Sequence, residues 1–587
     1  MDKYKWDLTR LFAGEKEFKD TINEVNELLD KIVKYNGRVL ENDNTLYEVL
    51  SIDEKIDLLI EKLYVYSHLG YYDDMSNTLF QKYKEECLSL VNKSQGLTSF
   101  ITPELLSSNY DKVKSFITKN KKLEKYSLML ERIFRYKKHV LSEKEEMILS
   151  NMSDILRVPK STYDAINNID IKFDKVKDSN GKMIELNTSN YSTFLTSKDK
   201  KVRRDAFNKE YKYYKEHINT ISSLYIGKVK SNYFISKTRN YNSILEMELF
   251  SDNIDVSLYN NLIDITNKSL KYLKHFYRVK SKMLGSKLHM YDLYVNTSKM
   301  PSETISYDNG LKIVNKALKP LGEEYLERFN YLIDNRCVDV YPKNKKRSGA
   351  YEWGSYGVLP YVSLNYENNI ESVSTLAHEM GHAMHTYYSN ANQDYIYAGY
   401  PIFLAEIAST VNEVLLSEYL INNTKNKDEK EYYLVEFLDK FKATVYRQVM
   451  FAEFEKIIHE KYENGESLTK DLLCDTYYEL NKKHFSPVVK VDENIKYEWA
   501  RIPHFYDSFY VYKYATGFIC ALIIADKLLH DDEFKDKYIK FLSSGNIKYP
   551  LDLLNDIGID LNNKKVLSRA FEIFDEKVKI LENLEME

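Results

Sequence analysis

The pentapeptide HEMGH at residues 378–382 has the residue types and the spacing of a metal site. His378 and His382 are four residues apart, so in a helix both imidazoles lie on one face. Two imidazoles can share one zinc ion, and a catalytic zinc site keeps one coordination position open for water. Glu379 can take the proton of that water. The pentapeptide therefore predicts a zinc site with Glu379 as general base. The alternative is an exposed polar helical turn.

A carboxylate that could complete the metal site lies further along the chain, at Glu406. The sequence from Pro401 onward predicts a helix, because proline favours the first helical position. Glu406 and Glu413 are seven residues apart and share a face among apolar neighbours. Buried carboxylates are costly unless they are paired or bind metal. We predict Glu406 as the third ligand and Glu413 as the acceptor that orients a ligand histidine. A plain surface charge is the alternative for Glu413.

Apolar spacing over residues 371–389 predicts the helix that carries the pentapeptide. Gly381 weakens a helix interior, so its place there suggests close approach of another backbone or of a substrate. Tight packing alone is the alternative. His385 lies two turns from His378, about 10 Å along the helix axis. That distance is too long for a shared tetrahedral ion, so we expect His385 to line a pocket or to be structural.

A late segment, residues 501–514, combines one histidine with several tyrosines. Peptide hydrolysis at zinc passes through a tetrahedral intermediate, whose oxyanion needs hydrogen-bond donors. His504 and one or two of the tyrosines could supply them. The alternative is a stripe of aromatic packing.

Composition narrows the class of protein. A formal net charge of −4 over 587 residues gives no electrostatic case for nucleic acid. The longest apolar stretch, around residues 515–525, is too short to span a bilayer, and the first residues hold no apolar signal core. The cysteines lack CxxC spacing, which disfavours a disulfide scaffold or a thiolate zinc site and fits a reducing compartment. We expect a cytoplasmic protein without nucleic-acid or membrane partners. The sequence sets no oligomeric state.

The elements around these residues are mostly amphipathic helices, from residue 1 to about 165 and again from near Ser197. Between them, a period-two run at residues 169–173 and a type I′ turn at Asn180-Gly181 predict a β-hairpin. The basic run at residues 198–204 reads as a solvated helix start rather than an anion site.

A second β-rich interruption spans residues 337–366. The clearest strand, Tyr361–Tyr366, comes just before the zinc helix, where its free backbone groups could bind an extended peptide. Residues 347–357 read as a flexible loop that could cover the site. A plain surface connection is the alternative.

With these motifs in place, the chain resembles oligoendopeptidase F, in the M3 (thimet oligopeptidase-like) family of zinc metallopeptidases. The zinc pentapeptide with its downstream glutamate is the specific part. Supporting matches cover most of the chain, at residues 6–8, 191–195, 239–243, 291–294, 347–351, 403–413 and 502–517. The resemblance implies a mainly α, two-lobed fold with a deep central channel and a small β-sheet beside the active site. We expect an N-terminal helical region over 1–195, with its hairpin near 169–187, and a catalytic region over 196–587.

The resemblance also implies a function. One Zn²⁺ per chain would be held by His378, His382 and Glu406, with Glu379 as the base. Such an enzyme cuts internal bonds of short unfolded peptides rather than folded proteins.

The family's transition-state donors map to His504 and the tyrosines that follow it. We favour Tyr510 and Tyr512 over Tyr506 and Tyr514. Two alternatives remain. A helical zinc carboxypeptidase can carry the same ligand pattern, and an inactive peptide-binding shell should show a broken ligand set or a missing base.

Overall fold

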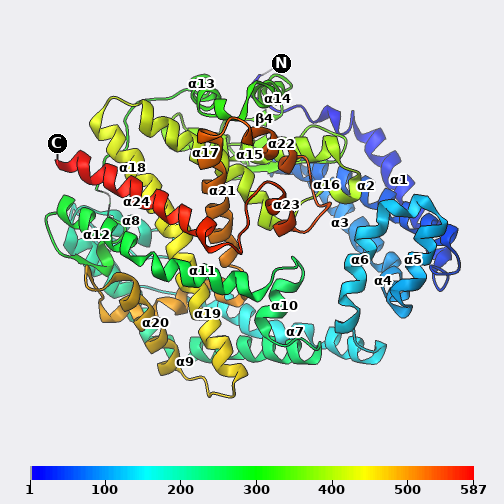
Figure 1. Ribbon diagram of the computed structural model, residues 1–587, viewed down its shortest axis with the longest axis horizontal. Helices are drawn as coiled ribbons and strands as arrows, with labels where there is room; N and C mark the ends of the chain where they lie inside the picture. Colours follow the sequence, from blue (N-terminus) through cyan, green and yellow to red (C-terminus); the bar gives the residue numbers. More distant parts are fainter. Residues whose placement is uncertain (1–2, 296, 587) are drawn as a thin grey trace. The chain divides into compact units, whose positions relative to one another are not determined.

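The computed structural model describes residues 3–295 and 297–586 and is mainly helical, which confirms the predicted fold class (Figure 1). The chain forms two compact units, each assembled from three segments. Unit 1 comprises Met1–Lys138, Ser302–Tyr419 and Ile524–Gly558, and unit 2 comprises His139–Pro301, Leu420–Ile523 and Ile559–Glu587. The predicted boundary between residues 195 and 196 lies inside unit 2. The two compact units therefore differ from the predicted regions 1–195 and 196–587. Those functional regions, like the central channel, stay a prediction.

Unit 1 is a set of helices around a small sheet. Its helices before the sheet are α1 (Glu15–Ile32), α2 (Asp43–Asp73), α3 (Thr78–Thr98), α4 (Ile101–Ser107), α5 (Tyr110–Lys119), α6 (Ser127–Arg135), α13 (Tyr307–Ala317) and α14 (Glu323–Asp334). The sheet contains β4 (Val338–Asp339), β5 (Tyr351–Trp353) and β6 (Tyr361–Ser363). After it come α15 (Ile370–Asn392), α16 (Tyr395–Ala398), α17 (Ile402–Asn423), α22 (Phe534–Leu542) and α23 (Pro550–Asp556), with the last residues of α17 in unit 2.

The sheet of unit 1 has the strand order β4-β6-β5. β6 pairs in parallel with β4, where Val362 faces Val338, and antiparallel with β5, where Val362 faces Glu352. The prediction of a strand before the zinc helix is confirmed, but the expectation that its backbone is free to bind a peptide is wrong. A central strand uses its backbone groups on both sides. The expected loop at residues 347–357 also proves to contain β5, the partner that covers β6.

Unit 2 is helical around an aromatic core. Its first elements are α7 (Glu143–Ala165), a π-helical turn (Ile166–Asp170), β1 (Lys175–Lys177), β2 (Met183–Glu185), α8 (Tyr191–Thr196), α9 (Lys200–Thr238), α10 (Ile244–Phe250), α11 (Val256–Lys268), α12 (Leu270–Met283) and β3 (Leu288–His289). Later come α18 (Lys427–Phe441), a π-helical turn (Lys442–Tyr446), α19 (Arg447–Glu463), α20 (Lys470–Phe485), β7 (Val489–Lys490), 3₁₀ turns at Glu493–Arg501 and Pro503–Tyr506, α21 (Tyr512–His530), whose last residues belong to unit 1, and α24 (Lys564–Met586).

The predicted hairpin is present, with two corrections. Its strands are β1 and β2, paired antiparallel with Val176 opposite Ile184, whereas residues 169–173 begin in the π-helical end of α7 and form no strand. A type I′ turn needs positive φ at both central residues. Only Gly181 is left-handed (φ 86°), and its N–H donates to the carbonyl of Asp178 at 3.1 Å. The connection is therefore a type I turn that ends in a left-handed glycine.

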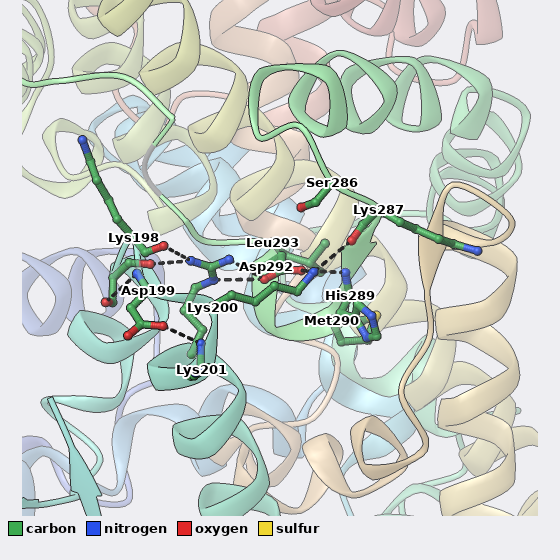
Figure 2. Close-up of polar contacts among 12 residues, drawn as sticks. Lys198, Asp199, Lys200, Lys201, Ser286, Lys287, His289, Met290, Asp292 and Leu293 are labelled. Atoms are coloured by element: carbon green, nitrogen blue, oxygen red, sulfur yellow. Dashed lines mark hydrogen bonds and ion pairs between the residues drawn. The ribbon is translucent and has the colours of Figure 1, made fainter. Parts of the chain in front are cut away.

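For the basic run at residues 198–204, the expectation of a solvated helix start holds for Lys198, Lys201 and Arg204, which are exposed, but not for Arg203, which is buried. Figure 2 shows Asp292 beside Lys200 of this run, and Arg203 Nε also donates to Asp292 Oδ1 at 3.0 Å. Arg203 Nη2 lies 2.7 Å from Asp292 Oδ1, and both side chains are almost fully buried. Lys200 Nζ lies 3.4 Å from the other carboxylate oxygen. Because a buried charge must be paired, this cluster ties the start of α9 to the chain beside β3.

Tyrosine and tryptophan fill much of the core of unit 2. The rings of Tyr225 and Phe454 stack at 6.2 Å, and Phe454 stacks on Trp499 at the same distance. The four cysteines of the chain are unpaired and buried, as expected from their spacing. Across residues 3–295 and 297–586, no helix is both long and apolar enough to cross a membrane.

Candidate active site

Two helices of unit 1, α15 and α17, carry the candidate metal ligands. The Asn369 side chain caps the start of α15 by accepting the N–H of Ser372 at 2.8 Å, as an N-cap residue should. The expected close approach at Gly381 is confirmed. A Cβ built there would lie 2.6 Å from Ser409 Cα and 2.8 Å from the carbonyl oxygen of Ala408. Glycine thus lets the backbone of α17 reach α15.

The packing of these helices brings the predicted ligands together. Across the described residues, one group of His, Cys, Asp and Glu side chains can hold a metal ion, and it consists of His378, His382 and Glu406. One ligand atom from each lies within 4.8 Å of the others. Glu406 Oε2 is 3.7 Å from His378 Nε2 and 3.8 Å from His382 Nε2. Two imidazole nitrogens and one carboxylate oxygen are a donor set that suits zinc with an open position.

Glu413 lies seven residues after Glu406 on the same face of α17, and its carboxylate reaches His378. Its Oε1 is 3.1 Å from His378 Nδ1. Burial disfavours the charged imidazole, but the hydrogen bond with Glu413 and the charges of Glu413, Glu379 and Glu406 together outweigh it and raise the pKa of His378. A carboxylate that accepts the Nδ1–H of a histidine leaves its Nε2 lone pair for a metal. The contact is the one expected for the predicted orienting residue.

Glu379, the predicted base, is buried next to the ligands, with 8% of its surface exposed. Burial raises the pKa of Glu379 to about 7, a shift opposed by the charge of His378 and reinforced by Glu406. A carboxyl group whose pKa is near neutral can both accept and return a proton. Burial also lowers the pKa of His382 to about 3, which favours the neutral imidazole that metal binding needs.

Two more titratable residues lie on α15 and on the adjacent strand β5. His385 is buried, stacks on Tyr400 at 3.6 Å and lies outside the metal group, as expected for a structural histidine. Glu352 was not predicted. Burial raises its pKa to about 8, opposed by a hydrogen bond with Thr386 and reinforced by the charge of Glu379. Glu352 stands on β5, a strand of three residues, which is too short to give the alternation that would have marked it.

The segment His504–Tyr514 belongs to unit 2. His504 is half-buried, and its Nε2 lies 3.4 Å from the hydroxyl of Tyr514. The ring of Tyr514 also contacts that of Tyr510, at 5.4 Å and nearly perpendicular. Burial lowers the pKa of His504, opposed by the charge of Asp507. The structure thus gathers one imidazole and two phenols into a small cluster.

Tyr512, the other favoured tyrosine, is part of the core of unit 2. It is fully buried and packs on Tyr259 at 5.3 Å. Tyr506 is also buried and stacks on Tyr163 at 4.3 Å. The amino-acid sequence alone does not distinguish these tyrosines, because a left-handed residue at Phe509 interrupts the spacing between them. Tyr514 is the member of the cluster that was ranked low when the resemblance was used to choose among the tyrosines.

The sequence is similar to known peptidases over almost the whole chain. The sequence profile of peptidase family M3 matches residues 193–573, and a profile described as oligopeptidase F matches residues 104–173. Oligopeptidase PepF of Bacillus subtilis is 37% identical over 583 residues, which cover 99% of this chain and 87% of that protein. An oligoendopeptidase F homolog of Borreliella burgdorferi is 38% identical over 580 residues, which cover 97% of this chain and 96% of that protein.

Solved structures extend the agreement to the fold. The crystal structure of oligoendopeptidase-F from Enterococcus faecium has a TM-score of 0.74 at 32% identity, with 97% of this chain and 99% of that chain covered. The crystal structure of a protein from Chlamydophila abortus has a TM-score of 0.94 at 33% identity, with 99% and 98% covered.

Proposed function

Because the chain belongs to peptidase family M3, we propose that it is a zinc-dependent endopeptidase that hydrolyses internal bonds of short oligopeptides. The observation that carries the zinc part of the proposal is the convergence of two imidazoles and one carboxylate within 4.8 Å. The intact ligand group and the buried Glu379 beside it also disfavour an inactive peptide-binding shell.

The residues present fit a catalytic zinc ion. His378, His382 and Glu406 would hold it, and Glu413 supports the tautomer of His378 that ligation needs. A zinc ion in such a site supplies Lewis acidity: it lowers the pKa of water and polarises a carbonyl. The half-exposed Glu406 side chain leaves the site open to solvent on one side.

Glu379 moves the protons in this proposal. It accepts one from the attacking water and returns it to the amine that leaves when the peptide bond breaks. Its raised pKa suits both steps, because a much stronger acid would hold the accepted proton poorly. The charges of Glu406 and Glu413 add to the effect of burial on that pKa.

His504 and Tyr510 are the proposed oxyanion donors, and Tyr514 joins them through its contact with His504. Each has an N–H or O–H to donate, and each lies on the less buried side of its segment. Tyr512 ranks below Tyr510, because its fully buried ring is packed in the core of unit 2. These roles rest on the side-chain chemistry and on the resemblance, and kinetics tests them.

The strand that could align a peptide is β5 rather than β6. β5 pairs with β6 on one side only, so its other edge keeps backbone groups that an extended peptide can use. β5 is also next to the catalytic helix: a Cβ on Gly354, which follows β5, would lie 2.3 Å from Thr386 of α15. We propose that the peptide lies along this edge.

Digestion of an acetylated and amidated peptide series of increasing length tests the proposal, with products identified by mass spectrometry. An endopeptidase cuts each peptide into one fragment with the acetylated N-terminus and one with the amidated C-terminus. A chelator stops this reaction. Release of single C-terminal residues from peptides with a free C-terminus, with no cleavage of blocked peptides, would instead identify a carboxypeptidase. Glu379→Gln serves as the matched control for a contaminating protease.

A further inference from the structure

The backbone of the segment His504–Tyr514 is strained at one buried residue. Phe509 has φ 56°, which is the left-handed region, and its ring is almost fully buried. A bulky residue rarely adopts this conformation, and it persists only where the surroundings hold it in place. Such strain is concentrated in functional sites. Phe509 stands directly before Tyr510, the proposed oxyanion donor.

A buried glutamate holds this turn from α19. Glu455 Oε1 accepts the N–H of Phe509 at 3.0 Å. Glu455 is fully inaccessible to solvent, and its other carboxylate oxygen has no hydrogen-bond partner. Burial raises the pKa of Glu455 well above its usual range, opposed by the Phe509 N–H and reinforced by the charge of Glu248. Burying a carboxyl group that accepts only one hydrogen bond costs free energy, so the presence of Glu455 here calls for an explanation.

Residues of α9 and α19 make further contacts with the same turn. Asn232 of α9 donates from Nδ2 to Ser508 Oγ at 2.6 Å and lies 3.3 Å from His459 Nε2. His459 Nδ1 is 2.8 Å from the carbonyl oxygen of Glu455, and its ring lies 4.7 Å from that of Phe509. Residues of two helices therefore fix two consecutive residues of the segment.

The turn decides which side chains share a face. Ser508 and Phe509 are both buried although they are consecutive, and after them the chain places Tyr514 beside His504 and Tyr510 beside Tyr514. With an ordinary φ at Phe509 the chain would leave the turn in another direction, and this cluster would not form. The geometry of the cluster therefore depends on the hydrogen bonds that hold Ser508 and Phe509.

We propose that Glu455 is a positioning residue: by accepting the N–H of Phe509, with Asn232 on Ser508, it holds the left-handed turn that places Tyr514 beside His504 and Tyr510 beside Tyr514. Glu455 contacts no substrate and acts through the backbone. This inference rests on the proposed function of the cluster as oxyanion donors.

Two variants separate positioning from charge. Glu455→Gln keeps an oxygen acceptor of the same shape and mimics the neutral acid, so kcat should remain within about twofold of wild type, since the hydrogen bond is kept. Glu455→Met keeps the volume but has no acceptor oxygen. Its kcat should fall about tenfold to 100-fold, because misplacement by an ångström costs that much, with KM and bound zinc little changed. The substrate is the end-blocked peptide cleaved by wild type.

Amide hydrogen exchange gives a readout that does not depend on activity. Peptic fragments covering residues 504–514 should exchange slowly in wild type and in Glu455→Gln but faster in Glu455→Met, with the rest of unit 2 unchanged. If wild type cleaves no peptide, the proposed function fails, and exchange alone decides whether Glu455 holds the turn.

A milder variant guards against a Glu455→Met protein that does not fold. Ser508→Ala removes the oxygen that Asn232 bonds, and kcat should fall about two- to tenfold for the loss of one hydrogen bond. Lys160→Ala is the matched control, because Lys160 of α7 contacts the same segment through Asp507. It removes a solvent-exposed ion pair with Asp507, and kcat should stay within about twofold. Unchanged kcat and unchanged exchange in both Glu455→Met and Ser508→Ala would overturn the proposal, as would a Glu455→Gln protein as impaired as Glu455→Met.

Discussion

The candidate metal ligands stand on two regular helices of unit 1, whereas His504 and Tyr510 stand on a segment of unit 2 made of 3₁₀ turns and one left-handed phenylalanine. In the first region, the spacing of the residues along a helix already puts the side chains on one face. In the second, the backbone has no repeating geometry, so neighbouring side chains point according to how buried partners hold each residue. A metal site and a donor site in one chain can therefore be built by different means.

The consequence concerns which residues each region depends on. The helical region needs little beyond its own ligands, the supporting Glu413 and the glycine that lets the helices approach. The irregular region depends on residues remote in sequence, Glu455 and Asn232. We expect substitutions in the first region to act through metal and proton transfer, and substitutions in the second to act through geometry.

The largest effect should come from Glu379→Gln. The amide cannot take up the water proton, so kcat should fall about 10²–10⁴-fold, the usual contribution of a general base. Zinc content should stay at one ion per chain, because Glu379 is not a ligand. Peptide assays with elemental analysis measure both. Normal turnover in this variant would show that another group is the base.

His504→Ala should cost less, about 10²–10³-fold in kcat, the range for one lost oxyanion donor. Tyr510→Phe should lower kcat in the same sense, and Tyr512→Phe should leave it nearly unchanged, because Tyr512 is buried away from the cluster. Steady-state kinetics of the three proteins measures this. A larger loss in Tyr512→Phe than in Tyr510→Phe would reverse the ranking of the tyrosines.

Glu413→Gln should weaken metal binding about 10–100-fold, as loss of a carboxylate that orients a ligand histidine does. Excess zinc should restore most of the activity, since the ligands themselves remain. Competition with a chelator of known affinity gives the dissociation constant. An unchanged constant would mean that Glu413 is a plain charge on the helix.

Gly381→Ala should destabilise the fold. Alanine adds about 1 kcal/mol of helix propensity, but its Cβ meets backbone atoms of α17 that cannot move aside, and overpacking costs about 1–3 kcal/mol. The second effect wins. Gly96→Ala in α3 is the matched control: a Cβ there has open space, so that variant should be slightly more stable. Chemical unfolding compares the two, and equal stability changes would show that the close approach at Gly381 carries no cost.

Sequence reasoning succeeded where periodicity carries the information. The helix from Ile370 to Asn392 and the pairing of His378 with His382 follow from spacing along a regular helix. Glu406 was predicted to join them because a carboxylate on the apolar face of the next helix needs a partner or a metal. The backbone approach at Gly381 was also expected, because a glycine inside a helix needs a packing reason.

Where periodicity is absent, prediction failed for identifiable reasons. A strand at residues 169–173 was expected from the alternation of apolar and polar residues. Such alternation over a short run also occurs at the end of a helix, and here residues 166–170 are π-helical. The free backbone expected of the strand Tyr361–Ser363 is taken up by β5, which hydrophobic pattern does not reveal in three residues. The order of the tyrosines depends on Phe509, whose left-handed backbone has no signal in the sequence, since phenylalanine rarely adopts it.

Zinc titration of the metal-free protein, with hydrolysis of an end-blocked peptide as the readout, tests most directly whether His378, His382 and Glu406 form the catalytic metal centre. We predict no activity without metal, a rise in proportion to added zinc, and a plateau at one equivalent per chain, with no such rise in His378→Ala. Full activity in the metal-free protein, or an identical titration curve for His378→Ala, would contradict the account.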